Sequence, residues 1–375
     1  MTAPPPTTRL ASVDALRGLT MAAMIVVNNP GSWSAMHPWL RHAPWGGWPR
    51  PADLIFPTFL FLVGVSTALA LGRRLDAGAS RADVTRAALR RAGGLVLLGV
   101  LLNLYPEFDA GTVRLPGVLQ RIAVVFAGCA LAYPRLGPHG LTATAAALIA
   151  GYGALLAWAP VPGAGGPVLT PDASLPTWLD DRLLGAHAWR GPGDPEGLLS
   201  TLPALAHGLL GVWVGRKLRR GGPPLAGAVR MAAVGAGLVL GGIGWTAWQP
   251  PAKEIWTPSY ALLTAGASLL LLAACRAGFD GVAGGRAPSL LTLLGRRALT
   301  AFVAAHLISD TAIRVLRWTT ADGGETSLHH WLKAWLWDGW LPPQAASLAA
   351  SLALLGLITA GLWLWEQRRA DITRA

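Results

Sequence analysis

The sequence predicts an all-α protein, a bundle of helices that crosses a lipid bilayer about ten times. Of its 375 residues, 53% are hydrophobic and only 13% are charged, and the mean hydropathy is +0.44. Soluble domains carry about 25% charged residues. The apolar residues also form long blocks, each near the ~20 residues that a helix needs to span the hydrocarbon core. A polytopic integral membrane protein is therefore expected.

The apolar blocks define the predicted spans and a single transmembrane domain over residues 9–366. Residues 1–8 are rich in Pro and Thr and are expected to form a disordered cytoplasmic tail, with a second cytoplasmic tail over residues 367–375. The predicted spans are 9–28, 53–72, 88–105, 115–133, 141–159, 197–216, 229–248, 258–275, 292–314 and 345–366.

Lys and Arg cluster in alternate connections between these blocks. Arginines crowd the connections after the second, sixth and eighth blocks and the end of the chain. Because cytoplasmic loops of membrane proteins are enriched in basic residues, both termini are expected to be cytoplasmic and residues 28–52 to face outward. The net charge of +12 is explained by these orientation charges, so it does not indicate nucleic-acid binding. Cys129 and Cys275 lie inside apolar blocks, and no disulfide framework is expected.

Polar residues inside or beside the predicted spans are the first candidates for function, because charge within a bilayer is costly. Asp14 and Arg17 lie at i, i+3 on one face of the first span, where they are either orientation charges or part of a site for an anionic ligand. Gln120 and Arg121 lie one turn into the fourth span. There Arg121 either extends to the interface or belongs to a packed polar site.

The outward segment between the first two spans has an unusual composition. It holds His42 together with Trp45, and Asp53 follows as the cap of the next helix. An imidazole can accept a proton from an attacking amine or hydroxyl, or carry an acyl group. Asn28, at the end of the first span, is expected to hydrogen-bond His42 and set its tautomer. The alternative is that His42 is an ordinary solvated loop residue.

Two further pairs near predicted helix ends have two interpretations each. Asp194 and Glu196 either suit the positive dipole end of a helix that begins near Pro195 or belong to a functional site. Lys253 and Glu254 precede the eighth span, where they form either a weak surface ion pair or a contact to a polar acceptor.

Five ordered motifs resemble the transmembrane acetyltransferase family of heparan-α-glucosaminide N-acetyltransferase, a lysosomal enzyme, and its bacterial relatives. The motifs are RLASVDALRGLTMAAMIVVNNPG, HAPWGGWPRPADLIFPTFLFLVG, LPGVLQRIAVVF, DPEGLLSTLPALAHGLLGVWVG and KEIWTPSYALLTAGA. The first of them also resembles the wider group of membrane acyltransferases that modify envelope polysaccharides. The matching segments spread over residues 9 to about 270.

This resemblance implies an acetyl-CoA-dependent acyltransferase in the bacterial inner membrane, without a metal. The family's active-site histidine and asparagine correspond to His42 and Asn28. The acetyl group would pass from cytoplasmic acetyl-CoA to an amine or hydroxyl of a sugar on the outer side. Residues expected to bind the cofactor or to order its site are Arg17, Asp14, Gln120, Arg121, Arg73, Arg74 and Arg90, and residues expected at the acceptor are Trp45, Asp53 and Glu254.

Other possibilities remain open at the level of the sequence. A polar-solute or glycolipid transporter or flippase could use the same intramembrane charges without covalent chemistry. The acceptor and the choice between a ternary complex and an acetyl-histidine intermediate are not specified. The expected partners are an amino-sugar or glycan acceptor and the bilayer. The many Gly and Ala residues allow close helix packing within one chain or between two copies, so a homodimer is also considered.

Overall fold

The predicted all-α class is confirmed by the computed structural model, which describes residues 10–189, 191 and 193–372. The predicted tail over residues 1–8 and the last three residues, 373–375, lie outside this part. The long helices are α1 (Ala11–Asn28), α2 (Pro51–Asp76), α3 (Arg81–Leu104), α4 (Val118–Ala132), α5 (Pro138–Trp158), α7 (Thr201–Arg219), α8 (Pro224–Trp245), α9 (Pro258–Cys275), α11 (Ala298–Asp310) and α13 (Pro343–Ile372).

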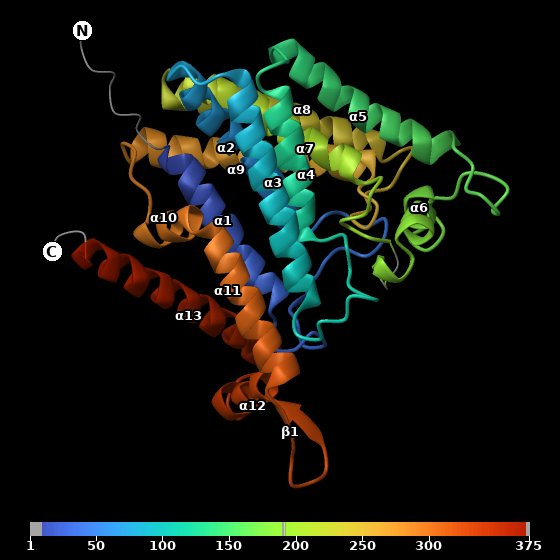
Figure 1. The fold of residues 1–375 in the computed structure, drawn as a ribbon, viewed down its shortest axis with the longest axis vertical. Coiled ribbons are helices and arrows are strands. Elements are labelled where there is room, and N and C mark those ends of the chain that lie inside the picture. The colour runs from blue at the N-terminus through green and yellow to red at the C-terminus, as the bar shows by residue number, and fades with distance from the viewer. Residues whose placement is uncertain (1–9, 190, 192, 373–375) are drawn as a thin grey trace.

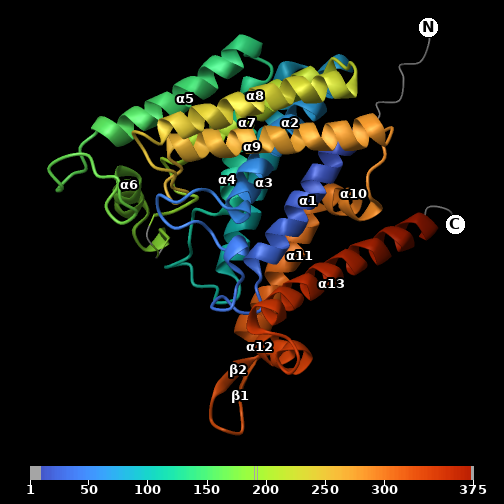
Figure 2. The same cartoon turned by 180° about the vertical axis from the view of Figure 1, so that it is seen from behind.

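Shorter elements join these helices. The short helices are η1 (Pro38–Leu40), α6 (Leu175–Leu184), η2 (Gly185–His187), η3 (Arg276–Val282), α10 (Ser289–Arg296), η4 (Thr311–Val315), α12 (Leu328–Lys333) and η5 (Ala334–Asp338). Strands β1 (Arg317–Thr319) and β2 (Glu325–Ser327) pair antiparallel, with Trp318 opposite Thr326. Their hairpin and α12 project from the helices, as Figures 1 and 2 both show.

Eight helices of the described chain are long and apolar enough to cross a membrane. Two helices that match predicted spans fall outside this set. Helix α4 has only 15 residues, and α7 carries His207, Arg216 and Lys217, which lower its hydropathy. Helix α7 packs against α2, α4 and α5, so neighbouring helices rather than lipid cover much of its surface.

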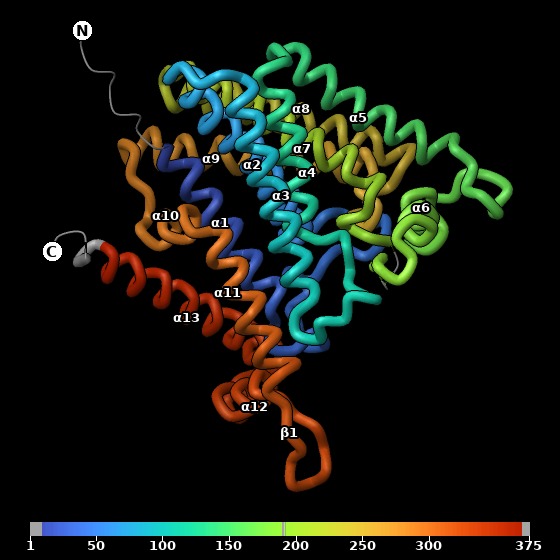
Figure 3. The backbone as a smooth tube through the Cα atoms, in the orientation of Figure 1, coloured from blue at the N-terminus to red at the C-terminus, as the bar shows by residue number. Residues whose placement is uncertain are grey.

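The predicted ninth span is interrupted. The chain turns at Arg297, so residues 292–314 divide among α10, α11 and η4 (Figure 3). Helix α13 continues to Ile372, past the predicted end of the last span at residue 366.

Glycine allows two pairs of helices to approach closely. A Cβ atom on Gly64 of α2 would lie 1.9 Å from the carbonyl oxygen of Gly208 in α7, and a Cβ on Gly18 of α1 would lie 1.9 Å from the carbonyl oxygen of Leu291 in α10. Small residues at such crossings let backbones meet where no hydrophobic effect between helices operates. Gly18 follows Arg17 directly, so this contact also brings Arg17 against α10.

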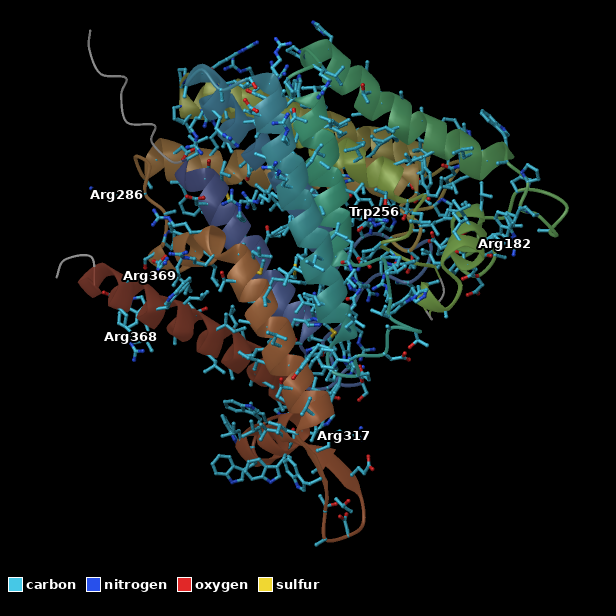
Figure 4. The ribbon with its side chains drawn as sticks, viewed as in Figure 1. Arg182, Trp256, Arg286, Arg317, Arg368 and Arg369 are labelled. Atoms are coloured by element: carbon cyan, nitrogen blue, oxygen red, sulfur yellow. The ribbon has the colours of Figure 1, made fainter. Side chains whose placement is uncertain are left out.

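The helix ends gather into two faces. At one face, Arg219 pairs with Asp76, and Ser12 binds Asp280 through its backbone N–H at 3.0 Å. Figure 4 shows Arg286, Arg368 and Arg369 on this side, which we call the basic end. The opposite face, which we call the site end, holds the loops after α1 and before α7 and α9. The arrangement of all the basic connections on one side, and their cytoplasmic placement, stay predictions.

Candidate active site

His42 and Asp53 form a hydrogen-bonded pair at the site end. His42 lies in the loop between α1 and α2, and its Nδ1 is 2.8 Å from Oδ1 of Asp53 in the first turn of α2. The other carboxylate oxygen accepts the backbone N–H groups of Ala43 at 2.9 Å and Arg50 at 2.8 Å. The Asp53 side chain is 1% exposed, whereas the His42 side chain is 42% exposed. Since a carboxylate only accepts, we assign the proton to Nδ1, which leaves the Nε2 lone pair free to act as a base.

Lys253 is the second neighbour of the His42 ring. Its Nζ lies 2.9 Å from Nε2 and 3.0 Å from Nδ1. Because the ammonium is almost equally distant from the two ring nitrogens, it lies over the ring rather than along the in-plane lone pair of Nε2, which stays available to the acceptor. Burial lowers the pKa of Lys253, and the negative charges of Asp53, Glu196 and Glu254 only partly offset this.

A tight turn before α9 holds Lys253 in this position. The Thr257 hydroxyl accepts the N–H of Ala252 at 2.9 Å and donates to the Pro250 carbonyl at 2.8 Å. Trp256 has a φ of 52°, a conformation that non-glycine residues rarely adopt, and it is fully buried. It lies in the interior in Figure 4. The turn is therefore fixed by its own hydrogen bonds and by packing.

Trp45 connects the histidine loop to this turn. Its side chain packs against a buried cluster that includes Tyr152, Ala252 and Ile255. The Tyr260 hydroxyl donates to the Asp53 carbonyl at 2.8 Å, which links α9 to the start of α2. These contacts set the distance between the two loops. A role for Trp45 in stacking on a sugar stays a prediction.

A buried charge cluster lies beside the site. Arg114 binds Asp194 and Glu196, with 2.8 Å to the Glu196 carboxylate. Burial alone would lower the pKa of Arg114, but the two carboxylates raise it. The prediction that Asp194 and Glu196 cap a helix is wrong, because α7 begins only at Thr201. The two carboxylates instead neutralise Arg114.

Arg121 and Asp180 extend this cluster. Arg121 donates to the Gly197 carbonyl and the Ser200 hydroxyl, both at 2.6 Å, and its guanidinium lies over the Trp256 ring at 5.2 Å. Asp180 accepts the Leu198 N–H at 2.8 Å. Burial raises the pKa of Asp180 to about 6. The packed polar site considered for Arg121 is thus present, at the site end.

Asn28 lines a separate cavity of about 240 Å³ rather than contacting His42. The cavity also exposes Asn103, Arg114, Gln120 and His306. Within residues 10–189, 191 and 193–372, no hydrogen bond joins Asn28 to His42, and Asp53 takes the orienting role expected of Asn28. Arg114 connects the cavity with the His42 site. It lines the cavity and forms an ion pair with Glu196, whose negative charge raises the pKa of Lys253.

The remaining predicted residues lie away from His42. Arg17 binds Asp14 at 3.2 Å, the Ser66 hydroxyl at 2.8 Å and the Gly295 carbonyl at 3.1 Å. The predicted Asp14–Arg17 pair is therefore present, and it ties α1 to α2 and α10. The exposed Arg73, Arg74 and Arg90 lie toward the basic end of α2 and α3, whereas Gln120 and Arg121 lie at the site end.

Three further residues have contacts that differ in how far the sequence indicated them: His306, Glu254 and Arg114. His306 joins α11 to α3, with its Nε2 at 3.1 Å from the Leu102 carbonyl oxygen. Glu254 forms no ion pair with Lys253 in the described chain, which excludes the surface-pair interpretation there. Arg114 was missed, although a lone arginine beside a predicted span and a distant pair of carboxylates were a usable signal.

The comparisons with known proteins agree with the motifs. A sequence model of the family described as "Heparan-alpha-glucosaminide N-acetyltransferase, catalytic" matches residues 9–173. The mouse protein named heparan-alpha-glucosaminide N-acetyltransferase is 28% identical over 262 residues, which cover 56% of this chain and 39% of the relative. The human protein of the same name is 34% identical over 125 residues, or 32% of this chain and 18% of the relative. The chain thus matches well under half the length of either relative.

Proposed function

From the similarity of residues 9–173 to this catalytic family, we propose that the protein is a membrane-embedded acetyltransferase. The donor would be cytoplasmic acetyl-CoA, and the acceptor an amine or hydroxyl of a sugar on the outer side. The protein would lie in a plasma membrane with both termini cytoplasmic. The observation that carries the proposal is the buried Asp53 carboxylate on Nδ1 of His42, which leaves Nε2 as a base on the exposed side.

In this proposal His42 removes the proton from the acceptor as it attacks the thioester carbonyl. Asp53 holds the imidazole in the correct tautomer and stabilises the imidazolium that forms. Because Asp53 is fixed by two backbone N–H groups, the ring does not need to reorient during the reaction. A positioned base of this kind contributes about 10²–10⁴-fold in rate.

Asn28 and the cavity around it would position the thioester or the acceptor. The cavity lining offers amide, guanidinium and imidazole groups, which suit the many hydroxyl and amide groups of a sugar or a pantetheine arm. Arg73, Arg74 and Arg90 are exposed toward the basic end, where they are available to phosphate groups of the donor.

The deciding experiment offers purified protein radiolabelled acetyl-CoA with glucosamine or N-acetylglucosamine and measures labelled product and free CoA thiol. We expect product with glucosamine, and a loss of at least 100-fold in His42→Gln. Full activity of a folded His42→Gln variant would refute the role of His42. Transport of the sugar without any dependence on acetyl-CoA would favour a transporter instead.

A single turnover without acceptor distinguishes the two chemical routes. Label retained on the protein and lost in His42→Gln indicates an acetyl-histidine intermediate. Label that stays in acetyl-CoA until acceptor is added indicates direct transfer in a ternary complex.

A further inference from the structure

Lys253 has no role in the mechanism above, yet its ammonium is among the groups nearest to the proposed base. Its Nζ lies 2.9 Å from Nε2 of His42, although the two residues are 211 positions apart in the chain. The hydrogen bonds of Thr257 and the buried Trp256 fix the turn that carries it. A charged side chain held this firmly against the reacting atom of a base calls for a chemical explanation.

We propose that Lys253 is a catalytic residue whose ammonium stabilises the oxyanion of the tetrahedral intermediate. This proposal rests on the acetyltransferase function proposed above. The attacking atom must come within hydrogen-bond distance of Nε2, and the carbonyl oxygen is bonded to the carbon that it attacks. A donor that already lies 2.9 Å from Nε2 is therefore within reach of that oxygen.

The charge changes of the reaction favour this movement of the ammonium. In the resting state the Lys253 ammonium lies 2.9 Å from Nε2 of a neutral imidazole. When Nε2 takes the proton of the acceptor, the ring becomes positive, and two positive groups then repel each other at about 3 Å. The negative charge appears on the carbonyl oxygen at the same moment. The lowered pKa of Lys253 also makes its ammonium a stronger hydrogen-bond donor.

The step is balanced without any further reactant. The bond from the acceptor nitrogen to the carbonyl carbon forms, and the carbonyl π electrons move to oxygen, where Lys253 donates a hydrogen bond. The carbonyl then re-forms as the carbon–sulfur bond breaks. The thiolate of CoA leaves and takes the proton from His42. Lys253 remains an ammonium throughout.

The other cations near the site are already engaged. Arg114 binds Asp194 and Glu196, and Arg121 binds the Gly197 carbonyl and the Ser200 hydroxyl. Lys253, by contrast, makes its closest contact to a neutral ring that gains a positive charge during the reaction.

The test compares Lys253→Met and Lys253→Arg with Lys333→Met as the matched control. Lys333 lies in α12 and pairs with Asp338 at 2.5 Å, so its loss removes a lysine at another place. We expect Lys253→Met to lower kcat about 10²–10³-fold with KM for acetyl-CoA changed less than about threefold. Lys253→Arg should recover part of kcat, and Lys333→Met should keep full activity.

Chemical rescue separates charge from packing. Lys253→Cys treated with 2-bromoethylamine regains an ammonium at nearly the same position, whereas iodoacetamide adds a neutral group. Wild-type protein treated in parallel controls for Cys129 and Cys275. Recovery of kcat with the amine alone supports the proposal, and equal recovery with both reagents overturns it. If Lys253→Met does not fold, the comparison of the two modified forms of Lys253→Cys still tests whether the positive charge is required.

Failure of the Lys253 proposal can be distinguished from failure of the proposed acetyltransferase function. An inactive His42→Gln together with an active Lys253→Met would refute only the role of Lys253. An active His42→Gln would refute the mechanism as a whole. Acetyl label on Lys253 itself in a single turnover would show a nucleophile and overturn the oxyanion role.

Discussion

Replacing Asp53 with Asn changes only the group that orients His42. The carboxylate accepts three hydrogen bonds, one from Nδ1 of His42 and two from the backbone N–H groups of Ala43 and Arg50. An amide has one oxygen and one NH₂ group. If its oxygen serves the two backbone donors, its NH₂ faces Nδ1. His42 then carries its proton on Nε2, so the base points inward and the outer nitrogen cannot accept a proton.

The magnitudes follow from these bonds. Hydrogen bonds to charged groups contribute about 1.5–3 kcal/mol and neutral ones about 0.5–1.5 kcal/mol, so weakening all three bonds in Asp53→Asn should lower stability by about 3–4 kcal/mol. Because the tautomer change lets Nδ1 accept from the buried NH₂ group, that amide stays paired and the fold should survive. Catalysis by the base, about 10²–10⁴-fold, should be lost almost completely.

The assay measures acetyl transfer to glucosamine, acetyl-CoA binding and the thermal midpoint of Asp53→Asn. Asp181→Asn, at an exposed position on α6, is the matched control. We expect a transfer rate close to that of His42→Gln with acetyl-CoA binding retained. A folded Asp53→Asn variant with half or more of the wild-type rate would refute the orienting role of Asp53.

Three further variants test the surroundings of the site. Arg114→Met leaves Asp194 and Glu196 buried without their cation and should cost about 3–5 kcal/mol, seen as a lower thermal midpoint that a triple variant with both carboxylates changed to amides partly restores. Asp180, whose pKa burial raises to about 6 in the folded protein, is protonated in both the folded and the unfolded state well below pH 4. The protein therefore loses stability as the pH rises from about 4 to about 6. Asp180→Asn should therefore increase the free energy of unfolding over wild type by about 1–2 kcal/mol more at pH 8 than at pH 5, and an equal increase at both pH values would contradict this. Asn28→Ala should lower kcat/KM about tenfold without a change in the thermal midpoint, since its side chain faces the cavity, and an unaltered kcat/KM would remove Asn28 from the site.

The fold class could be predicted from the sequence because the bilayer demands long apolar helices, and most predicted spans match observed ones. The exceptions have physical causes. Helix α7 is covered by other helices and tolerates lower hydropathy. The break at Arg297 leaves the residues on both sides apolar, so hydropathy alone does not detect it.

The site was only partly predictable. His42 and Asp53 are 11 positions apart and joined by one loop, so a cap and a nearby histidine could be recognised together. The contacts of Lys253 with His42 and of Arg114 with Asp194 and Glu196 join distant segments, so the sequence offers the charges of these residues as a signal but not their pairing. The expected hydrogen bond from Asn28 to His42 is absent from the described residues, because the packing of α1 turns the Asn28 side chain toward the cavity.

The separation of His42 and Lys253 has a consequence for biogenesis. Synthesis at about 5–20 residues per second makes Lys253 roughly 10–40 s after His42. During that interval the chain contains the proposed base and its carboxylate but lacks the ammonium against the ring. The matched catalytic segment, residues 9–173, also ends before Lys253. If Lys253 has the proposed role, the nascent chain stays inactive until α9 is in place, which delays chemistry on donor or acceptor until insertion is nearly complete.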